Sequence, residues 1–289
     1  MLNTKIKEVN RKSMLIRYSG RSSDYISPSF GYGCLLNCSY CYMKRHKANG
    51  LDIANNYNDI LTAINEHAYF YADVSKPNQT DDKYITYDIS CNEDFALHAK
   101  YYQWEKIFQF FVDHPIAKAT LATKIVPMRF LDFNPQQKVR IRFSLMPQKI
   151  AKIVEPNTAS ILSRILAIDK FIDAGYDIHV NFSPVIMYKG WECDYKELFE
   201  LVNDNVKNKD KVKAEVIFLT HNKNKHSYNL KHNIAGEEML WNPEIQEFKR
   251  SQYGGLNVRY KRNYKKIWVN RWEDLHSSII PWNTIRYIF

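Results

Sequence analysis

Residues 31–42 read Gly-Tyr-Gly-Cys-Leu-Leu-Asn-Cys-Ser-Tyr-Cys-Tyr, and this stretch decides the fold. Cys34, Cys38 and Cys41 form a C-x3-C-x2-C triplet. A 4Fe-4S cluster needs thiolates on a loop that curls around it, and three thiolates leave one iron open to an outside ligand. The glycines at positions 31 and 33 let backbone approach a cofactor. We therefore predict that the triplet holds such a cluster.

Two other interpretations of the triplet stay open. A zinc ion would take the three cysteines with His46 as a fourth ligand, or the three residues are core cysteines that coincide in the sequence. Ligand chemistry favours the cluster. The odd total of five cysteines is a metal pattern rather than a disulfide framework, and it predicts a reducing compartment.

The bulk composition limits the class of protein. With 289 residues, 45% of them hydrophobic, the chain can bury a large core, and one catalytic domain is expected. An excess of 41 Lys and Arg over 31 Asp and Glu favours a polyanionic partner, although a merely basic protein would show it too. The N-terminus lacks an apolar signal core and no stretch has the length of a membrane helix, which predicts a cytoplasmic protein with no membrane partner.

Strand and helix patterns alternate along the chain. Short β-branched or aromatic runs predict strands at 84–89, 119–122, 139–145, 178–182 and 214–219. Apolar residues at three- and four-residue spacing predict helices at 58–71, 102–112, 159–174 and 195–206, the third of them capped by Gly175. This alternation indicates βαβ units and a parallel sheet, either open or closed into a complete or partial barrel.

Two segments depart from this alternation. The polar stretch 76–83 is predicted to be a surface loop. From Lys249 to Arg271 the apolar periodicity fades, Tyr253-Gly254-Gly255 is typical of a turn, and aromatic residues alternate with cations. Such a tail suits a phosphate backbone and stacked or flipped bases.

At this point the sequence resembles the radical S-adenosylmethionine superfamily, with Tyr40 as the aromatic before the third cysteine, and within it the spore photoproduct lyase family. The landmarks are Cys-Ser-Tyr-Cys-Tyr at 38–42, Ser-Cys-Asn-Glu-Asp at 90–94, Thr-Lys at 123–124, Arg-Phe-Ser at 142–144, Glu-Pro-Asn-Thr at 155–158, Ala-Gly-Tyr at 174–176, Gly-Trp-Glu at 190–192 and Tyr-Gly at 253–254. The fold expected from pattern and resemblance is α/β, a partial (β/α)6-type radical SAM barrel over 1–235. A basic, aromatic extension over 236–289, with a β-hairpin, would pack on that barrel.

The resemblance implies reductive cleavage of S-adenosylmethionine (SAM) on the open iron, giving a 5'-deoxyadenosyl radical that removes hydrogen from the substrate. Cys91 matches a cysteine that returns a hydrogen atom to the product radical, against the alternative of a small buried hydrophobe. Tyr40 and Tyr42 match a pair of tyrosines that pass the hydrogen onward, although aromatics that merely pack beside a cluster would look the same. A reductant such as flavodoxin or ferredoxin is implied.

Three further residues match cofactor-binding positions. Lys124 corresponds to a lysine that meets the methionyl carboxylate. Ser144 corresponds to a cofactor-contacting serine, whose hydroxyl would otherwise bond to backbone. Glu93 stands where the lyases carry serine, and its carboxylate is expected to bind the methionyl ammonium. The family pattern requires no cysteine at Cys193, which we take to be structural or incidental.

The substrate is predicted from the tail. Tyr253 matches a lesion-probing hairpin, and Arg259 is expected to bind substrate beside it. Gln252 replaces the arginine of that hairpin, and Met146 replaces an asparagine. Three functions follow: a carbon-carbon lyase that repairs spore photoproduct, a thymine lesion in DNA; a radical SAM enzyme that modifies another nucleobase, nucleotide or peptide; and a non-catalytic zinc-dependent nucleic-acid-binding protein.

Overall fold

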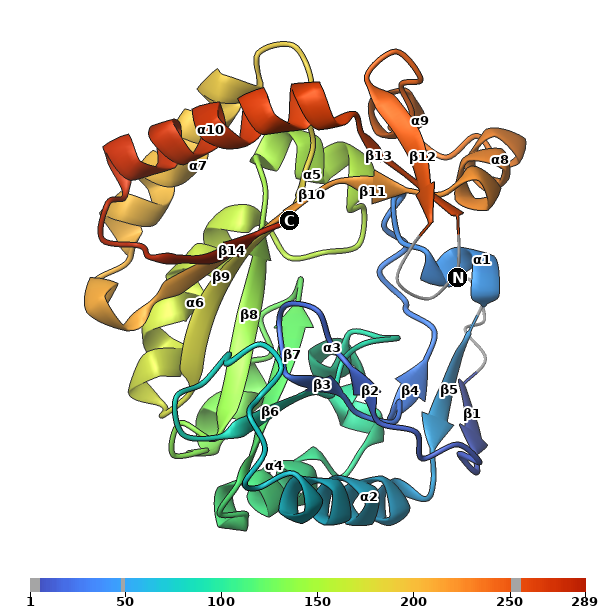
Figure 1. Cartoon of the computed structure of the whole chain (residues 1–289), viewed down its shortest axis with the longest axis vertical. Helices are drawn as coiled ribbons and strands as arrows, with labels where there is room; N and C mark the ends of the chain where they lie inside the picture. Colours follow the sequence, from blue (N-terminus) through green and yellow to red (C-terminus); the bar gives the residue numbers. More distant parts are fainter. Residues whose placement is uncertain (1–5, 48–49, 251–255) are drawn as a thin grey trace. The chain divides into compact units, whose positions relative to one another are not determined.

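A computed structural model describes residues 6–47, 50–250 and 256–289 of the chain (Figure 1). The described elements belong to two compact units, each treated by itself below. The first unit comprises Met1–Leu35, Asn49–Phe143 and Ala167–His179. The second comprises Leu36–Ala48, Ser144–Leu166 and Val180–Phe289.

The main sheet has the strand order β14-β10-β9-β8-β7-β6-β3-β2. Its strands are β2 (Arg17–Tyr18), β3 (Tyr25–Ile26), β6 (Ile85–Asp88), β7 (Ala117–Thr123), β8 (Val139–Leu145), β9 (Asp177–Val185), β10 (Lys213–Phe218) and β14 (Ile285–Ile288). The pairs β3-β6, β6-β7, β7-β8 and β10-β14 are parallel, and β2-β3 is antiparallel. Every residue of β8 is buried, as expected for a parallel strand covered on both faces. The five predicted strands are thus confirmed, and the pairs β6-β7 and β7-β8 among them are parallel, as predicted.

The helices and small sheet of the first unit surround its strands. Its helices are α2 (Tyr57–Phe70), α3 (Phe95–His98) and α4 (Trp104–Asp113). Its small sheet joins β1 (Ile6–Val9), β5 (Leu51–Ala54) and β4 (Gly31–Tyr32). Helix α2 buries Ile60, Leu61, Ile64 and Ala68, a helical spacing, and packs on β7. The predicted helices at 58–71 and 102–112 are therefore present with slightly shifted ends.

Gly175 ends α6 (Ile161–Asp173) as predicted. Its φ is +94°, a left-handed conformation that favours glycine. The Gly175 N–H donates to Ile172 O at 3.0 Å, and the Tyr176 N–H donates to Phe171 O at 3.0 Å. These two bonds form a Schellman motif, which satisfies carbonyls that the end of a helix otherwise leaves open.

The second unit holds an aromatic core between two helices. Helix α7 (Trp191–Asn205) packs beside α10 (Arg262–Ile279), as Figure 1 shows. Trp272 of α10 is fully buried, with its ring centroid 5.1 Å from Phe199 and 5.2 Å from Phe182. The sequence did not predict α10, because Trp272 and His276 are its only fully buried side chains among the described residues and leave no apolar stripe.

The remaining elements of the second unit lie around a three-stranded sheet. They are α1 (Met43–His46), α5 (Gln148–Val154), β11 (Thr220–His221), α8 (Lys223–Lys231), α9 (Glu237–Leu240), β12 (Gln246–Arg250) and β13 (Leu256–Tyr260). Strands β12 and β13 pair antiparallel, which confirms the β-hairpin predicted for the C-terminal extension. The division between 235 and 236 stays a prediction.

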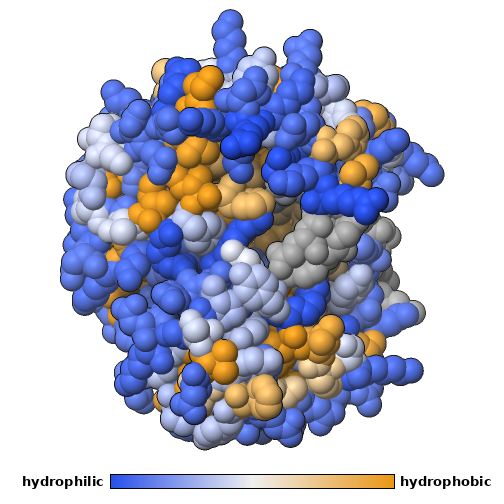
Figure 2. Space-filling model, in the orientation of Figure 1, coloured by the Kyte–Doolittle hydropathy of each residue, from blue (hydrophilic) through white to orange (hydrophobic). Residues whose placement is uncertain are grey.

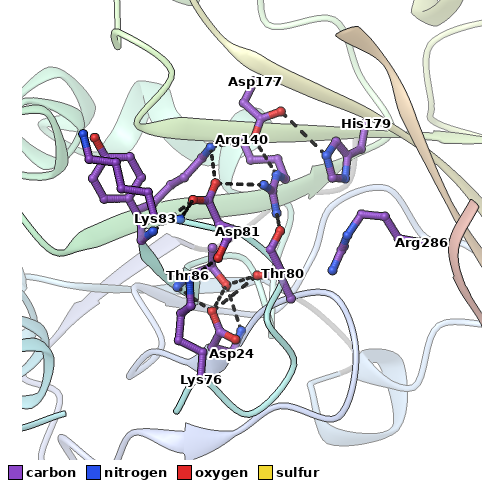
Figure 3. Close-up of polar contacts among 12 residues, drawn as sticks. Asp24, Lys76, Thr80, Asp81, Lys83, Thr86, Arg140, Asp177, His179 and Arg286 are labelled. Carbon is purple, nitrogen blue, oxygen red and sulfur yellow. Dashed lines mark hydrogen bonds and ion pairs between the residues drawn. The ribbon is translucent and has the colours of Figure 1, made fainter. Parts of the chain in front are cut away.

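A network of buried charged side chains joins the amino ends of three strands to a loop of the first unit (Figure 3). Lys118 Nζ lies 2.8 Å from Asp81 Oδ2 and 2.7 Å from Asp177 Oδ2. Arg140 approaches the same two oxygens at 3.3 and 2.7 Å. Asp81 is only 13% exposed, so the stretch predicted to be a surface loop sends a carboxylate into the protein.

Replacing Asp177 with asparagine is expected to destabilise the protein by about 3 kcal/mol, because it leaves Arg140 and Lys118 buried with one fewer counter-charge. Thermal or urea unfolding measures the loss. Asp73→Asn, at an exposed aspartate, is the control and should stay within about 0.5 kcal/mol of the wild type. Equal stabilities of the two variants would contradict an energetic role for the network.

The same network predicts the response to acid. Burial alone would raise the pKa of Asp177, but Arg140, His179 and Lys118 lower it below its usual range. Burial alone would also raise the pKa of Asp81, but the nearby cation of Lys118 is the chief cause that lowers it. Carboxylates with a lowered folded-state pKa stabilise the protein above pH about 4, and this contribution is lost as the pH falls further. In the Asp177→Asn variant, the free energy of unfolding should therefore decrease less steeply as the pH falls through this range.

One face of the molecule is mainly hydrophilic. Figure 2 shows a face on which hydrophilic residues predominate and hydrophobic residues form separate patches. Within the described ranges, the structure contains no helix with the length and apolar character needed to span a membrane.

Candidate active site

The cysteine triplet lies on the loop between β4 and α1, as predicted. Cys38 is buried, whereas Cys34 and Cys41 are half-buried. The loop starts at Gly33, whose φ of +117° suits glycine and whose N–H donates to Asn92 O at 3.1 Å. It curls back where the Cys41 N–H donates to Cys38 O at 3.0 Å. The short gaps between the cysteines thus form a compact turn.

Ser39, which belongs to the second unit, holds this loop at three points within that unit. Its N–H donates to Val154 O and its hydroxyl to Ala235 O, both at 2.8 Å. Its carbonyl accepts a hydrogen bond from Asn229 Nδ2 at 2.9 Å. The loop backbone therefore keeps its position independently of the cysteine side chains.

Tyr40 donates its phenolic hydrogen to a buried ion pair. The acceptor is Glu155 Oε1, and Glu155 Oε2 lies 2.9 Å from Arg164 Nη2, with both side chains of that pair fully buried. Burial and the adjacent Glu155 raise the pKa of Tyr40 well above its usual value. Tyr40 therefore keeps its phenolic hydrogen at physiological pH. Tyr42 is 41% exposed and lies edge-on to His46.

Cys91 lies on a loop after β6 that its neighbours hold in place. Ser90 Oγ accepts from the Phe95 N–H at 3.1 Å and donates to Glu93 O at 3.0 Å. Asp94 caps α3 by accepting from the Leu97 N–H at 3.0 Å. The hydrogen bonds that hold this loop therefore come from Ser90 and Asp94, which flank Cys91 in the Ser-Cys-Asn-Glu-Asp stretch.

The Cys91 thiol has a cationic neighbour that the sequence did not suggest. Arg17 Nη2, from β2, lies 3.8 Å from Cys91 Sγ. The two residues are 74 positions apart, and β2 has only two residues, so periodicity carried no signal for this contact. The Arg17 guanidinium therefore lies on one side of the Cys91 thiol.

Glu93 carries a carboxylate that the protein satisfies on one oxygen. The side chain is 1% exposed. Oε2 accepts from Tyr102 Oη at 2.7 Å and lies 3.1 Å from His98 Nδ1, whereas Oε1 is buried with no hydrogen-bond partner among the described residues. A Cβ at Gly31 would lie 2.7 Å from Glu93 Cδ, so only glycine leaves room for this arrangement. Sequence reasoning missed His98 and Tyr102, although the Asp94 cap signals the helix that carries His98.

Lys124 and Ser144 follow or end strands of the sheet, as predicted. The Lys124 N–H donates to Asp94 Oδ2 at 3.0 Å, and Thr123 Oγ1 donates to Asp94 Oδ1 at 2.9 Å. Asp94 thus positions the turn that carries the half-buried Lys124. Ser144 is 1% exposed, and its Oγ has no hydrogen-bond partner within the described ranges.

The remaining residues singled out from the sequence lie in different settings. Arg259 pairs across the hairpin with Glu247, its Nη2 3.0 Å from Oε1. Tyr253 and Gln252 lie outside the described residues. Cys193 is exposed on α7. Met146 is buried at 1% exposure.

Comparison with known proteins identifies relatives over most of the chain. A family model described as spore photoproduct lyase matches residues 4–289. The spore photoproduct lyase of Bacillus subtilis (strain 168) is 27% identical over 192 residues, which cover 66% of this chain and 54% of the relative. The spore photoproduct lyase of Clostridium acetobutylicum is 25% identical over 242 residues, covering 81% and 68%. The chain thus matches little more than half the length of the B. subtilis relative.

Solved structures of the same family are similar in fold. A spore photoproduct lyase mutant with bound AdoMet and dinucleoside spore photoproduct gives a TM-score of 0.87 at 18% identity, over 98% of this chain and 82% of the other. A spore photoproduct lyase complexed with dinucleoside spore photoproduct gives 0.86 at 19% identity, with the same coverage. These matches confirm the predicted fold, a partial α/β barrel.

Proposed function

This chain belongs to the spore photoproduct lyase family, and we propose that it is a radical SAM carbon-carbon lyase that repairs spore photoproduct, a thymine lesion in DNA. The observation that carries the proposal is the cysteine triplet together with Cys91 in a chain that matches the family over residues 4–289. The names of the relatives support the same activity.

The residues present fit a 4Fe-4S cluster and SAM. Cys34, Cys38 and Cys41 would supply three thiolates to the cluster. The buried Glu93 Oε1, which has no partner among the described residues, suits the methionyl ammonium, because a buried carboxylate oxygen requires a donor or cation. The partnerless Ser144 Oγ suits a polar group of the same cofactor, and Lys124 suits its carboxylate.

When bound, the cluster and SAM supply a 5'-deoxyadenosyl radical, and the protein must orient it and exclude side reactions. Cys91 returns a hydrogen atom from its thiol to the carbon-centred thymine radical left when the methylene bridge breaks, which leaves a sulfur radical on Cys91. Tyr40 and Tyr42 would relay the radical, rather than hydrogen, back toward the cofactor: a phenolic hydrogen atom goes to the Cys91 sulfur radical, and the tyrosine regains one from the 5'-deoxyadenosine that the cofactor leaves. The raised pKa of Tyr40, caused by burial and by Glu155, supports this role because it keeps the phenolic hydrogen in place.

The partners follow from this activity. The net charge of +10 supports a DNA substrate, with Tyr253 and Arg259 as substrate-binding residues on the hairpin. The cluster needs a one-electron reductant such as flavodoxin or ferredoxin, and its thiolates suit a reducing, cytoplasmic setting. The alternative, modification of another nucleobase, nucleotide or peptide, draws on Met146, whose buried side chain stands where the family carries asparagine.

Anaerobic incubation with a spore-photoproduct dinucleotide, and with an oligonucleotide containing it, tests the activity. The reconstituted, reduced protein should convert the lesion to two thymines while cleaving SAM. SAM cleavage without lesion repair on either substrate would favour the alternative substrate class. One bound zinc with no iron and no SAM cleavage would instead establish the non-catalytic zinc protein.

Glu93→Gln is expected to weaken SAM binding about 10- to 100-fold, since a hydrogen bond to a charged group contributes about 1.5–3 kcal/mol. Glutamine keeps the shape of the side chain and an oxygen for Tyr102. Isothermal titration of the reconstituted protein with SAM measures the change, and Glu105→Gln, at an exposed glutamate of α4, is the control. An unchanged affinity would remove Glu93 from the cofactor site.

A further inference from the structure

Two histidines and one glutamate converge in the second unit. His221 ends β11, His226 lies on α8, and Glu237 begins α9. His221 Nε2 lies 2.9 Å and His226 Nδ1 lies 2.5 Å from the same oxygen, Glu237 Oε1. Their side chains are 0%, 19% and 7% exposed, so the cluster is largely shielded from water.

Surrounding side chains hold the three groups in position. The Trp241 ring stacks on the His226 ring with centroids 4.0 Å apart and an angle of 9° between the planes. Asn229 Nδ2 donates to the other carboxylate oxygen, Glu237 Oε2. An outer hydrogen bond that orients a ligating carboxylate in this way is typical of metal sites.

Hydrogen bonds among the three side chains do not satisfy the whole cluster. Asn229 is fully buried, and its Oδ1 has no hydrogen-bond partner in the described part of the chain. A buried amide oxygen without a partner is unfavourable.

We propose that His221, His226 and Glu237 bind one divalent first-row transition metal ion, for which Zn²⁺ is the probe. Two imidazoles and a carboxylate are an established ligand set for such ions. A tetrahedral zinc ion holds its ligand atoms roughly 3.4 Å apart. The three donors lie within 4.8 Å of one another, so small rotations of the side chains close the site.

The bound ion supports the cysteine loop through one residue. Asn229 donates both to Glu237 and to Ser39 O, and Ser39 lies between Cys38 and Tyr40. The metal site would therefore fix α8 and α9 and, through Asn229, the backbone of the loop. This role is distinct from the proposed catalysis, because none of the three ligands belongs to the cysteine triplet or to its SAM-binding residues.

Metal content of the full chain tests the site. The triple variant Cys34→Ser, Cys38→Ser and Cys41→Ser removes the competing thiolates. After chelation, incubation with Zn²⁺ and desalting, it should retain about one Zn²⁺ per chain by mass spectrometry. Adding Glu237→Gln should lower this to less than about 0.2, because the amide replaces the anionic ligand. Co²⁺ should give the visible absorption of a site with nitrogen and oxygen ligands.

His232→Gln, at an exposed histidine one residue beyond α8, is the matched control and should keep the wild-type zinc content. If Glu237→Gln fails to fold, as circular dichroism would reveal, His226→Gln replaces it, because His226 is partly exposed. A triple variant that retains no Zn²⁺, or one whose zinc content is the same with and without the Glu237 or His226 substitution, would overturn the proposal. Either result leaves the lyase assignment untouched, since that assignment depends on iron and SAM cleavage.

Discussion

Cys38→Ala is expected to abolish the iron-sulfur cluster and to reduce SAM cleavage by at least about a thousand-fold, since the reaction without its cofactor is slower by many orders of magnitude. Cys38 is the buried member of the triplet, at 5% exposure. Alanine cannot supply the third thiolate, and two thiolates do not hold the cluster in place. Iron and sulfide analysis, visible absorption and the yield of 5'-deoxyadenosine measure the loss.

The loss should reflect the missing ligand rather than unfolding. Ser39 holds the loop through three backbone or hydroxyl contacts that alanine at position 38 leaves intact. Cys193→Ala, at an exposed cysteine on α7, is the control and should retain iron and activity. A Cys38→Ala protein with full iron content and full cleavage would show that the triplet does not ligate the cluster.

Cys91→Ala should separate cofactor cleavage from repair. We expect 5'-deoxyadenosine to form at a rate close to that of the wild type, whereas the yield of thymine from spore photoproduct falls at least about tenfold. Without the thiol, the substrate radical takes hydrogen or another group from elsewhere and gives different products. Chromatography with mass spectrometry of the dinucleotide products measures the change.

The structure around Cys91 indicates that Cys91→Ala tests the loss of the thiol alone. Ser90 and Asp94 hold the loop around Cys91, so removal of one sulfur should leave its backbone in place. Cys91→Ser keeps the size of the side chain but offers a stronger O–H bond, and it should resemble alanine in its products. If the thymine yield is unchanged in Cys91→Ala, Cys91 is not the hydrogen donor and another residue must be sought.

Local patterns predicted much of the fold. Strand β8 spans 139–145, as predicted, because seven consecutive buried residues leave a clear signal. Gly175 ends α6 because the left-handed turn favours glycine, a preference that is visible in one letter of sequence. Helix α10 was missed because a helix with two fully buried residues, Trp272 and His276, lacks an apolar stripe. The stretch 76–83 is a loop, as predicted, but the burial of the Asp81 carboxylate left no local signal because its partners lie far along the chain.

The candidate site likewise has features that local sequence patterns predict and features that they do not. The sequence by itself determined that Cys34, Cys38 and Cys41 share one loop and that Cys91 follows a strand, because short spacings and single elements leave their mark in consecutive residues. Tertiary structure alone decided that Tyr40 donates to Glu155, that Tyr102 and His98 satisfy one oxygen of Glu93, and that His221, His226 and Glu237 meet. These contacts join residues of different elements. Whether two such side chains touch depends on the path of the backbone between the elements, and no local sequence pattern contains that information.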